Sequence, residues 1–460
     1  MINTFSTISH IPKQCQLARQ YPGFWRSMVG KPDGYGNYGN KDQMSFRETD
    51  GYLFCEDIKV KDIQDRIPTS PFYLYSLKRI LENYKAYEDA LKGIPSIISY
   101  ALKANSNLTI ARHLRQAGAG ATLVSGNELK IAMAAGFDPK IVTYNGNGKT
   151  TPELSMAVLH NVMVNIDSEF DLEHIRKAAN DTGKKANVTL RINPNIDAEV
   201  HPYIATGFKN SKFGIMNEHL DWYLDKIKSH PELNLVGIHC HLGSTIKKVK
   251  IFQDAMQVMM GVFNEIRSRG FEIKYLNLGG GLGIDYERNA DIPSQSDLID
   301  SIRGDLLSDM VLILEPGRSI VGDAAILVNR VTGVKSNGSK HFIVVDGSMA
   351  ELIRPSLYDA YHHIGFIEPV SGEAKSFDIV GPICESSDFL GKDRELPTPH
   401  ESAGLVVYDA GAYSYIMSSN YNLKMRPAEY LVDGKQLTRI RRAETMDDYM
   451  RLFENDPVAI

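Results

Sequence analysis

Strand-like and helix-like segments alternate along residues 79–330, and this alternation limits the possible folds more than any other feature. Short apolar runs predict strands, and most of the stretches between them have the spacing of amphipathic helices. Eight parallel strands alternating with helices over about 250 residues predict an α/β fold, a (β/α)8 barrel, with an open doubly wound sheet as the alternative. The strand count and even spacing favour the barrel. The predicted strands are 97–103, 121–125, 141–145, 162–166, 187–192, 235–240, 274–278 and 311–315.

The sequence changes in character after residue 330. Short strand-like runs follow one another with turn residues between them, and most of the intervals lack helical spacing, which predicts a second, all-β domain. Residues 45–78 contain strand-like runs as well and are expected to join that domain. The barrel is then an insertion in a discontinuous β domain. The predicted parts are an N-terminal extension (1–44), the first β strands (45–78), the barrel (79–335) and the remaining β domain (336–460).

The composition narrows the range of partners. The chain has 460 residues, of which 43% are hydrophobic and 23% charged, and its net charge is −5 with no basic block. We therefore expect neither nucleic acid nor an anionic membrane as the main partner. No run approaches about eighteen apolar residues, so no membrane span is predicted. The four cysteines form no C-x-x-C pair, which favours a reducing compartment over a disulfide framework.

The N-terminal extension has no acidic residue before Asp33 and is rich in basic and hydroxyl-bearing residues. This composition is typical of an organelle transit segment, although a short disordered extension fits equally well. The extension lacks the apolar core of a secretory signal, so export is disfavoured.

The apolar segment 97–105 predicts a strand buried on both faces, and this strand ends at the amine of Lys103. A buried ammonium is costly, so we expect this amine to lose its proton readily or to be used covalently. Desolvated lysines at strand ends form Schiff bases with carbonyl cofactors. A lysine that extends into solvent just past the strand is the alternative for this segment taken alone.

The carboxyl ends of the last two predicted strands suit the chemistry that barrels carry out there. Adjacent glycines at 279–283 let several N–H groups converge on an anion, so we expect a phosphate site. Glu315 ends the eighth strand, and a carboxylate beside a heteroaromatic nitrogen keeps that nitrogen protonated. Gly317 and Arg318 follow and suit a phosphate or a carboxylate, with a surface Glu–Arg ion pair as the alternative.

Two histidines lie two residues apart at the end of the sixth predicted strand. Because residues i and i+2 of a strand share one face, His239 and His241 should point the same way. They could bind a metal, but no third ligand lies nearby, and we predict no metal site. Stacking on a flat cofactor fits better, although either could be an ordinary interior histidine. With Lys103, Glu315 and the glycines, they indicate pyridoxal phosphate, to which Ser244 could donate.

The motifs taken jointly resemble those of the diaminopimelate decarboxylases, pyridoxal phosphate enzymes with the alanine racemase fold. The resemblance extends over residues 50–455, nearly the whole chain. Segments 124–129 and 422–427 are most similar to the plant-type, plastid-targeted members. The motifs are 100–105, 201–207, 211–214, 239–244, 279–283, 315–318, 351–358 and 384–389.

The resemblance implies a role for each matching position. Lys103 would be catalytic and form the Schiff base, Glu315 would pair with the pyridine nitrogen, and His241 would stack on the ring. The other cofactor-binding residues would be Ser244, Gly281, Gly317, Arg318 and Tyr421. The substrate-binding residues would be Arg318, Arg354, Tyr358, Glu385 and Tyr421.

The implied substrate contacts divide into two groups. Arg318, Arg354 and Tyr358 would bind the carboxylate at the end that does not react, as suits the bidentate geometry of guanidinium groups. Glu385 would recognise the distal amino group, and Cys384 would be catalytic in protonating Cα. In the family, this Cys-Glu-Ser segment enters the partner's active site, which implies an obligatory homodimer.

The implied activity is decarboxylation of meso-diaminopimelate to L-lysine and CO2, in a plastid, with a cytoplasmic location as the alternative. An ornithine- or arginine-type decarboxylase, an amino-acid racemase and a catalytically inactive homologue are the rival interpretations. Arg354, Tyr358 and Cys384 disfavour them. One position departs from related decarboxylases, which often place an aspartate after the second strand, near the cofactor lysine. Residues 120–124 contain no acidic residue, and Thr122 stands among them.

Overall fold

The computed structural model of the chain describes residues 45–204, 206–207, 211–289 and 292–453. The N-terminal extension, with its predicted transit segment, lies outside the described residues. Within them, no helix combines the length and the apolar character that a membrane crossing requires.

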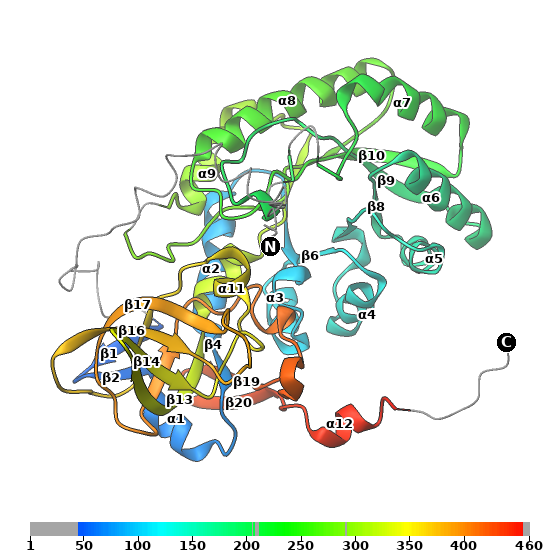
Figure 1. The fold of residues 1–460 in the computed structure, drawn as a ribbon. Coiled ribbons are helices and arrows are strands. Elements are labelled where there is room, and N and C mark those ends of the chain that lie inside the picture. Colours follow the sequence, from blue (N-terminus) through cyan, green and yellow to red (C-terminus); the bar gives the residue numbers. More distant parts are fainter. Residues whose placement is uncertain (1–44, 205, 208–210, 290–291, 454–460) are drawn as a thin grey trace, which may run out of the picture. The chain divides into compact units, whose positions relative to one another are not determined.

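Eight parallel strands form a closed barrel, which confirms the predicted fold class (Figure 1). Their order around the barrel is β10-β11-β12-β5-β6-β7-β8-β9. Strands that are consecutive in the sequence are therefore neighbours, and the barrel closes where β12 pairs with β5. The strands are β5 (Ser96–Ala101), β6 (Gly120–Leu123), β7 (Val142–Tyr144), β8 (Met163–Ile166), β9 (Ala186–Arg191), β10 (Leu233–His239), β11 (Tyr275–Asn277) and β12 (Val311–Leu314).

Helices alternate with these strands. Local signals mark several ends: Ser125 and Ser168 accept N–H groups at the starts of α4 and α6, and Gly136 and Gly183 end these helices with positive φ. The α-helices are α1 (Val60–Arg66), α2 (Leu77–Ala90), α3 (Leu108–Gln116), α4 (Gly126–Ala135), α5 (Thr151–Leu159), α6 (Glu169–Thr182), α7 (Leu220–Ser229), α8 (Val249–Ser268), α9 (Gln295–Ile302), α10 (Arg318–Val321), α11 (Arg354–Tyr358) and α12 (Met446–Met450). Short 3-10 helices are η3 (Leu102–Ala104), η4 (Pro139–Ile141), η5 (Pro202–Ile204), η6 (Asn217–His219), η7 (Arg303–Asp305), η8 (Gly322–Ala324), η9 (Tyr415–Met417) and η10 (Tyr421–Leu423).

A nine-stranded sheet makes up most of the second domain. Its main path runs β17-β16-β14-β13-β4-β19-β20, and β18 and β15 extend it from β13. β4 precedes the barrel in the sequence, yet it pairs with β13 and β19, which follow the barrel. The β domain is therefore discontinuous in sequence, as predicted. The strands are β4 (Phe72–Ser76), β13 (Ala325–Asn337), β14 (Lys340–Val345), β15 (Ile364–Phe366), β16 (Ala374–Val380), β17 (Phe389–Pro397), β18 (Gly404–Val407), β19 (Ala428–Asp433) and β20 (Gln436–Arg441).

The first strands after the extension differ from the prediction, because only β4 joins the large sheet. β1 (Phe46–Thr49), β2 (Tyr52–Cys55) and β3 (Ile58–Lys59) form a separate three-stranded sheet. Leu53 and Cys55 of β2 nevertheless pack in one apolar cluster with residues of the large sheet. The two sheets therefore share a core, and they are joined by a backbone hydrogen bond of 3.0 Å from the N–H of Leu53 in β2 to the oxygen of Ile367, directly after β15.

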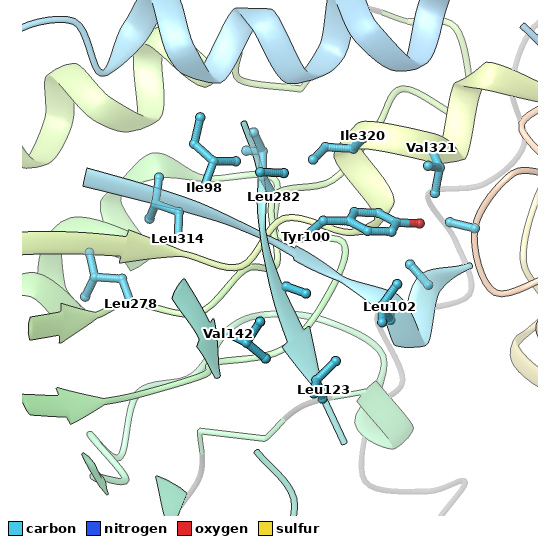
Figure 2. Close-up of a cluster of buried hydrophobic side chains, with 14 of the residues drawn as sticks. Ile98, Tyr100, Leu102, Leu123, Val142, Leu278, Leu282, Leu314, Ile320 and Val321 are labelled. Atoms are coloured by element: carbon cyan, nitrogen blue, oxygen red, sulfur yellow. The ribbon is translucent and has the colours of Figure 1, made fainter. Parts of the chain in front are cut away.

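Apolar packing around β5 positions the segment that carries Lys103. Ile98, Tyr100 and Leu102 pack in one cluster with Leu314 of β12 and Ile320 of α10 (Figure 2). Because side chains alternate along a strand, Ser99 points the other way, into the barrel. β5 ends earlier than predicted, at Ala101, and Lys103 lies in the single turn η3 directly beyond it.

Candidate active site

A hydrogen-bonded carboxylate lies at the carboxyl end of the barrel. Glu315, directly after β12, is 6% exposed. Its oxygens accept hydrogen bonds from Asn277 Nδ2 at 2.7 Å, from Asn145 Nδ2 at 3.0 Å and from Thr143 Oγ1 at 3.1 Å. His239 Nε2 lies 3.3 Å from Oε2. Burial alone would raise the pKa of Glu315, but the contact with His239 and the amide donors outweigh it and lower this pKa.

Polar side chains from all eight strand ends form a layer around this carboxylate, here called the polar layer. Thr122 hydrogen-bonds to Ser99 at 3.0 Å and to Thr143 at 2.9 Å, and Asn165 donates to Asn145 at 2.8 Å. None of its members is more than 6% exposed. The members are Ser99, Thr122, Thr143, Asn145, Asn165, Thr189, His239, Asn277 and Glu315. A buried network of this kind can hold a charged carboxylate in one orientation.

The glycine loop after β11 lies directly beside Glu315. A Cβ on Gly280 would be 2.1 Å from the Glu315 carbonyl oxygen, so only glycine allows this close approach. Gly281 has φ +114°. Within the described residues, no atom accepts a hydrogen bond from the backbone N–H of Gly281 or of Gly317. These two donors are therefore available to an anion.

Lys103 is half-buried and makes no hydrogen bond or ion pair with any described residue. Its charge acts on two neighbours. Desolvation lowers the pKa of His241 well below its ordinary value, and the charges of Lys103 and Arg191 lower it further, so this ring is neutral. Burial raises the pKa of Glu128. The hydrogen bond from the Val124 N–H and the charge of Lys103 offset part of this rise. An acidic group thus lies near Lys103, but it comes from α4 and not from the strand that carries Thr122.

The two histidines at the end of β10 make different contacts. His239 is the last residue of β10, is 1% exposed and contacts Glu315 directly. His241 lies beyond the strand, and its Nδ1 accepts the Gly280 N–H at 3.3 Å. The stacking role predicted for His241 remains a prediction, and its neutral ring is compatible with it. In the described part of the chain, no group of three or more His, Cys, Asp or Glu residues could hold a metal.

Arg318 follows Glu315 by three residues and is 6% exposed. Its Nε and Nη2 donate to Ser244 Oγ at 3.1 and 3.0 Å, and its Nη1 donates to Tyr286 Oη at 2.6 Å. Because Ser244 Oγ accepts hydrogen bonds from Arg318, the hydroxyl proton of Ser244 points away from the guanidinium. The serine hydroxyl thus remains available to donate to a phosphate.

A second buried guanidinium shares the same tyrosine. Arg354, at the start of α11, is 4% exposed, and its guanidinium carbon lies 4.6 Å from the centre of the Tyr286 ring. The corresponding distance for Arg318 is 5.8 Å. Among the described residues, neither arginine has a carboxylate within 4.0 Å, and Arg354 Nε has no hydrogen-bond partner. Two buried guanidiniums that no carboxylate contacts form a site for a ligand carboxylate, although the charge of Arg354 also acts on buried Asp409.

Three of the predicted residues lie at the surface. Cys384, Glu385 and Tyr421 are exposed, and a hydrogen bond joins Glu385 to Tyr421. In the described part of the chain, none of their hydrogen bonds reaches Lys103 or Glu315. Tyr358 is half-buried, and its ring contacts that of His201 at 5.8 Å between centroids. One protomer therefore brings Lys103, Glu315 and the arginines together but does not assemble all the predicted residues.

Comparison with known proteins identifies the family. Residues 77–322 match the pyridoxal binding domain of the pyridoxal-dependent decarboxylases. The chain is 58% identical over 414 residues to a probable chloroplastic diaminopimelate decarboxylase of Oryza sativa subsp. japonica, covering 89% of this chain and 84% of that one. It is 42% identical to the diaminopimelate decarboxylase of Aquifex aeolicus, covering 86% and 94%. The chain belongs to the diaminopimelate decarboxylase family.

A solved structure of a family member agrees. The diaminopimelate decarboxylase of M. jannaschii, crystallised with L-lysine, superposes with a TM-score of 0.84 at 36% identity. The superposition covers 90% of this chain and 98% of that one. The predicted family is confirmed.

The residues present in this decarboxylase fit pyridoxal phosphate. An unpaired lysine amine is available to its aldehyde, the polar layer presents an ionised carboxylate to its ring nitrogen, and free N–H groups lie where its phosphate would bind. The Asn145 donor is shared between both oxygens of Glu315, and the His239 contact is long at 3.3 Å. Glu315 Oε2 therefore keeps capacity to accept from a ring N–H.

Several residues of this decarboxylase's site had no role predicted from the sequence. Asn145 and Asn277 could have been noticed as polar residues at the ends of apolar strands, on the face that points into the barrel. Tyr286 and His362 lie in segments without strand or helix spacing, so no local signal identified them.

Proposed function

We propose that the enzyme decarboxylates meso-2,6-diaminopimelate to L-lysine and CO2. The observation that carries this proposal is the pair of buried guanidiniums, Arg318 and Arg354, which lack a carboxylate partner among the described residues. Diaminopimelate has a second carboxylate at the end that does not react, and this group would neutralise them. A diamino acid with only one carboxylate, such as L-ornithine, would leave that charge uncompensated.

Each cofactor-binding role matches the chemistry of the side chain or backbone group that would perform it. Lys103 holds the cofactor through its amine, Glu315 keeps the ring nitrogen protonated, and His241 packs its neutral ring against the cofactor. The phosphate ligands are Ser244, Gly281, Gly317 and Tyr421. Pyridoxal phosphate supplies an electron sink for the pair of electrons that remains at Cα when CO2 leaves.

The remaining residues orient the substrate and move a proton. Arg318, Arg354 and Tyr358 bind the distal carboxylate, so that the bond to the reacting carboxylate is held in the orientation in which it breaks. Glu385 accepts a hydrogen bond from the distal ammonium group. Cys384 donates the proton that Cα receives after CO2 has left.

We further propose a homodimer in which Cys384 and Glu385 of each protomer act in the partner's active site. Cys384, Glu385 and Tyr421 are exposed, and the apolar side chains of Ile416 and Leu423 near them are exposed as well, which supports a protein–protein contact here. Mixing Lys103→Ala and Cys384→Ala protomers tests the arrangement. Random pairing should restore about a quarter of wild-type activity, because half the dimers would contain one intact site. Absence of recovery would argue for sites within single protomers.

We propose a plastid location and retain the domain boundaries 45–78, 79–335 and 336–460 for the same enzyme. The chloroplastic name of the rice relative and the acid-poor composition of residues 1–44 support the location. A fluorescent protein fused after residue 44 should enter plastids, whereas a diffuse cytoplasmic signal would contradict the proposal.

The activity is tested with purified enzyme supplied with pyridoxal phosphate. Incubation with meso-diaminopimelate should release L-lysine and CO2 in equal amounts, and L-ornithine and L-lysine should release no CO2. Release of CO2 from L-ornithine but not from meso-diaminopimelate would overturn the proposed substrate.

A further inference from the structure

Arg354 is held by one buried histidine that the proposed mechanism does not use. Its Nη1 lies 2.7 Å from Nε2 of His362, and His362 Nδ1 lies 2.8 Å from the backbone oxygen of Tyr408. His362 has no exposed surface. Its ring also packs edge-on against Tyr286, with 5.3 Å between the centroids.

These contacts determine which nitrogen of His362 carries the proton. A backbone carbonyl only accepts hydrogen bonds, so Nδ1 must carry a proton to bond Tyr408. A guanidinium only donates, so Nε2 must be unprotonated to accept from Arg354. The ring is therefore the neutral Nδ1–H tautomer. Desolvation, followed by the charge of Arg354, lowers the pKa of His362 well below its ordinary value, in agreement with a neutral ring.

The hydrogen bond occupies one edge of the guanidinium and leaves another available. Nη1 is directed at His362, whereas the buried Nε of Arg354 has no partner among the described residues. A neutral histidine ring accepts this hydrogen bond without adding negative charge, so it leaves the positive charge of Arg354 available to a ligand. An aspartate or glutamate at position 362 would instead neutralise it and weaken its attraction for a ligand carboxylate.

We propose that His362 is a positioning residue that orients Arg354 for the distal carboxylate of the substrate while leaving its positive charge available. The inference rests on the proposed function, because that function assigns the carboxylate to Arg354. His362 itself lies behind the guanidinium and touches no reacting atom. It thus acts on substrate recognition through Arg354, with Tyr286 as the second wall of the site.

The test uses a matched pair of substitutions in the cofactor-loaded enzyme. His362→Phe keeps the ring that packs against Tyr286 and removes both nitrogens, and His362→Gln retains an acceptor and a donor. His363→Phe is the control, because this neighbouring histidine packs on Tyr408 and has no contact with Arg354. Should His362→Phe fail to fold, His362→Leu carries the same test. The measurements are KM and kcat for meso-diaminopimelate, and the dissociation constant of L-lysine by calorimetry.

His362→Phe should raise both KM and the L-lysine dissociation constant about tenfold, with a smaller effect on kcat, because one hydrogen bond to a charged group is lost. His362→Gln should restore most of the affinity, and His363→Phe should match the wild type. In an Arg354→Ala background, His362→Phe should add little, because its partner is already absent.

Unchanged KM and L-lysine affinity in His362→Phe would overturn the inference, as would an equal loss in the Arg354→Ala background. If the wild type converts meso-diaminopimelate and His362→Phe behaves like it, only this inference fails. If the wild type does not convert meso-diaminopimelate, the proposed function itself fails.

Discussion

Asn277 donates a hydrogen bond of 2.7 Å to the carboxylate of Glu315, and the same amide accepts the N–H of Gly279 at 2.8 Å. One side chain at the end of β11 therefore joins the carboxylate to the glycine loop. The two groups proposed to bind opposite ends of the cofactor, its ring nitrogen and its phosphate, are thus held in register by a single buried amide.

Glu315→Gln should change how stability depends on pH. The pKa of Glu315 is lowered in the folded protein, so its stabilising contribution is present above its unfolded pKa of about 4.3 and is lost as the pH falls toward the folded pKa. The difference in Tm between cofactor-free wild type and Glu315→Gln should therefore shrink as the pH falls from about 5 to about 3. A constant difference over that range would show that Glu315 titrates normally.

Lys103→Ala should abolish the covalent attachment of pyridoxal phosphate. The amine is not bonded to any described residue, so its loss should leave the fold intact while activity falls on the order of 10⁴-fold or more. Borohydride reduction followed by mass spectrometry should add the cofactor mass to the wild type alone. A stable adduct in Lys103→Ala would place the attachment at another lysine.

Gly280→Ala should weaken cofactor binding. The added Cβ would lie 2.1 Å from the Glu315 carbonyl oxygen, so the loop must move away from its anion-binding position. Gly283→Ala is the control, because the nearest atom to its Cβ would be 3.3 Å away. Fluorescence titration of cofactor-free protein should show a dissociation constant at least about tenfold higher for Gly280→Ala. Equal affinities for the two variants would exclude this loop from the cofactor site.

Arg354→Met should stabilise the fold but weaken substrate binding. Removing a buried charge that no carboxylate contacts should raise the Tm of the substrate-free enzyme by a few degrees, a gain that exceeds the lost bond to His362. KM for meso-diaminopimelate should rise about 100-fold, because the distal carboxylate loses a guanidinium partner. Thermal melts and steady-state kinetics on the same preparation measure both. A lower Tm together with normal KM would give Arg354 a purely structural role.

Thr122→Val should weaken the polar layer. The substitution preserves shape but removes the hydroxyl that bonds to Ser99 and Thr143, which costs about 1 to 3 kcal/mol in the free energy of unfolding. Urea unfolding measures this value. Thr332→Val, on the exposed part of β13, should change it by less than about 0.5 kcal/mol. Equal effects would indicate that the layer adds nothing beyond ordinary β-sheet hydrogen bonding.

The barrel was predictable because its strands are buried on both faces and read as apolar runs at even spacing. The unpredicted strands belong to the β domain, where β20 (Gln436–Arg441) has only Leu437 and Ile440 among four polar or charged residues, without the alternation of a half-buried strand. The separate sheet of β1 to β3 was also unpredictable, since strand pairing depends on contacts between distant segments. Among site residues, Lys103 and Glu315 were identified because they follow strands, where a barrel carries its chemistry.

The sequence by itself determined the barrel, the lysine and carboxylate at its rim, and the glycines beside them, because each depends on local periodicity or on position relative to a strand. Only the tertiary structure determined which groups surround the charged side chains at this rim. Closure of the barrel placed polar residues from the other seven strand ends in one layer with Glu315, and folding of the second domain brought His362 against Arg354. A hydrogen bond depends on distance and direction in space, and residues far apart along a chain carry no local sign of either.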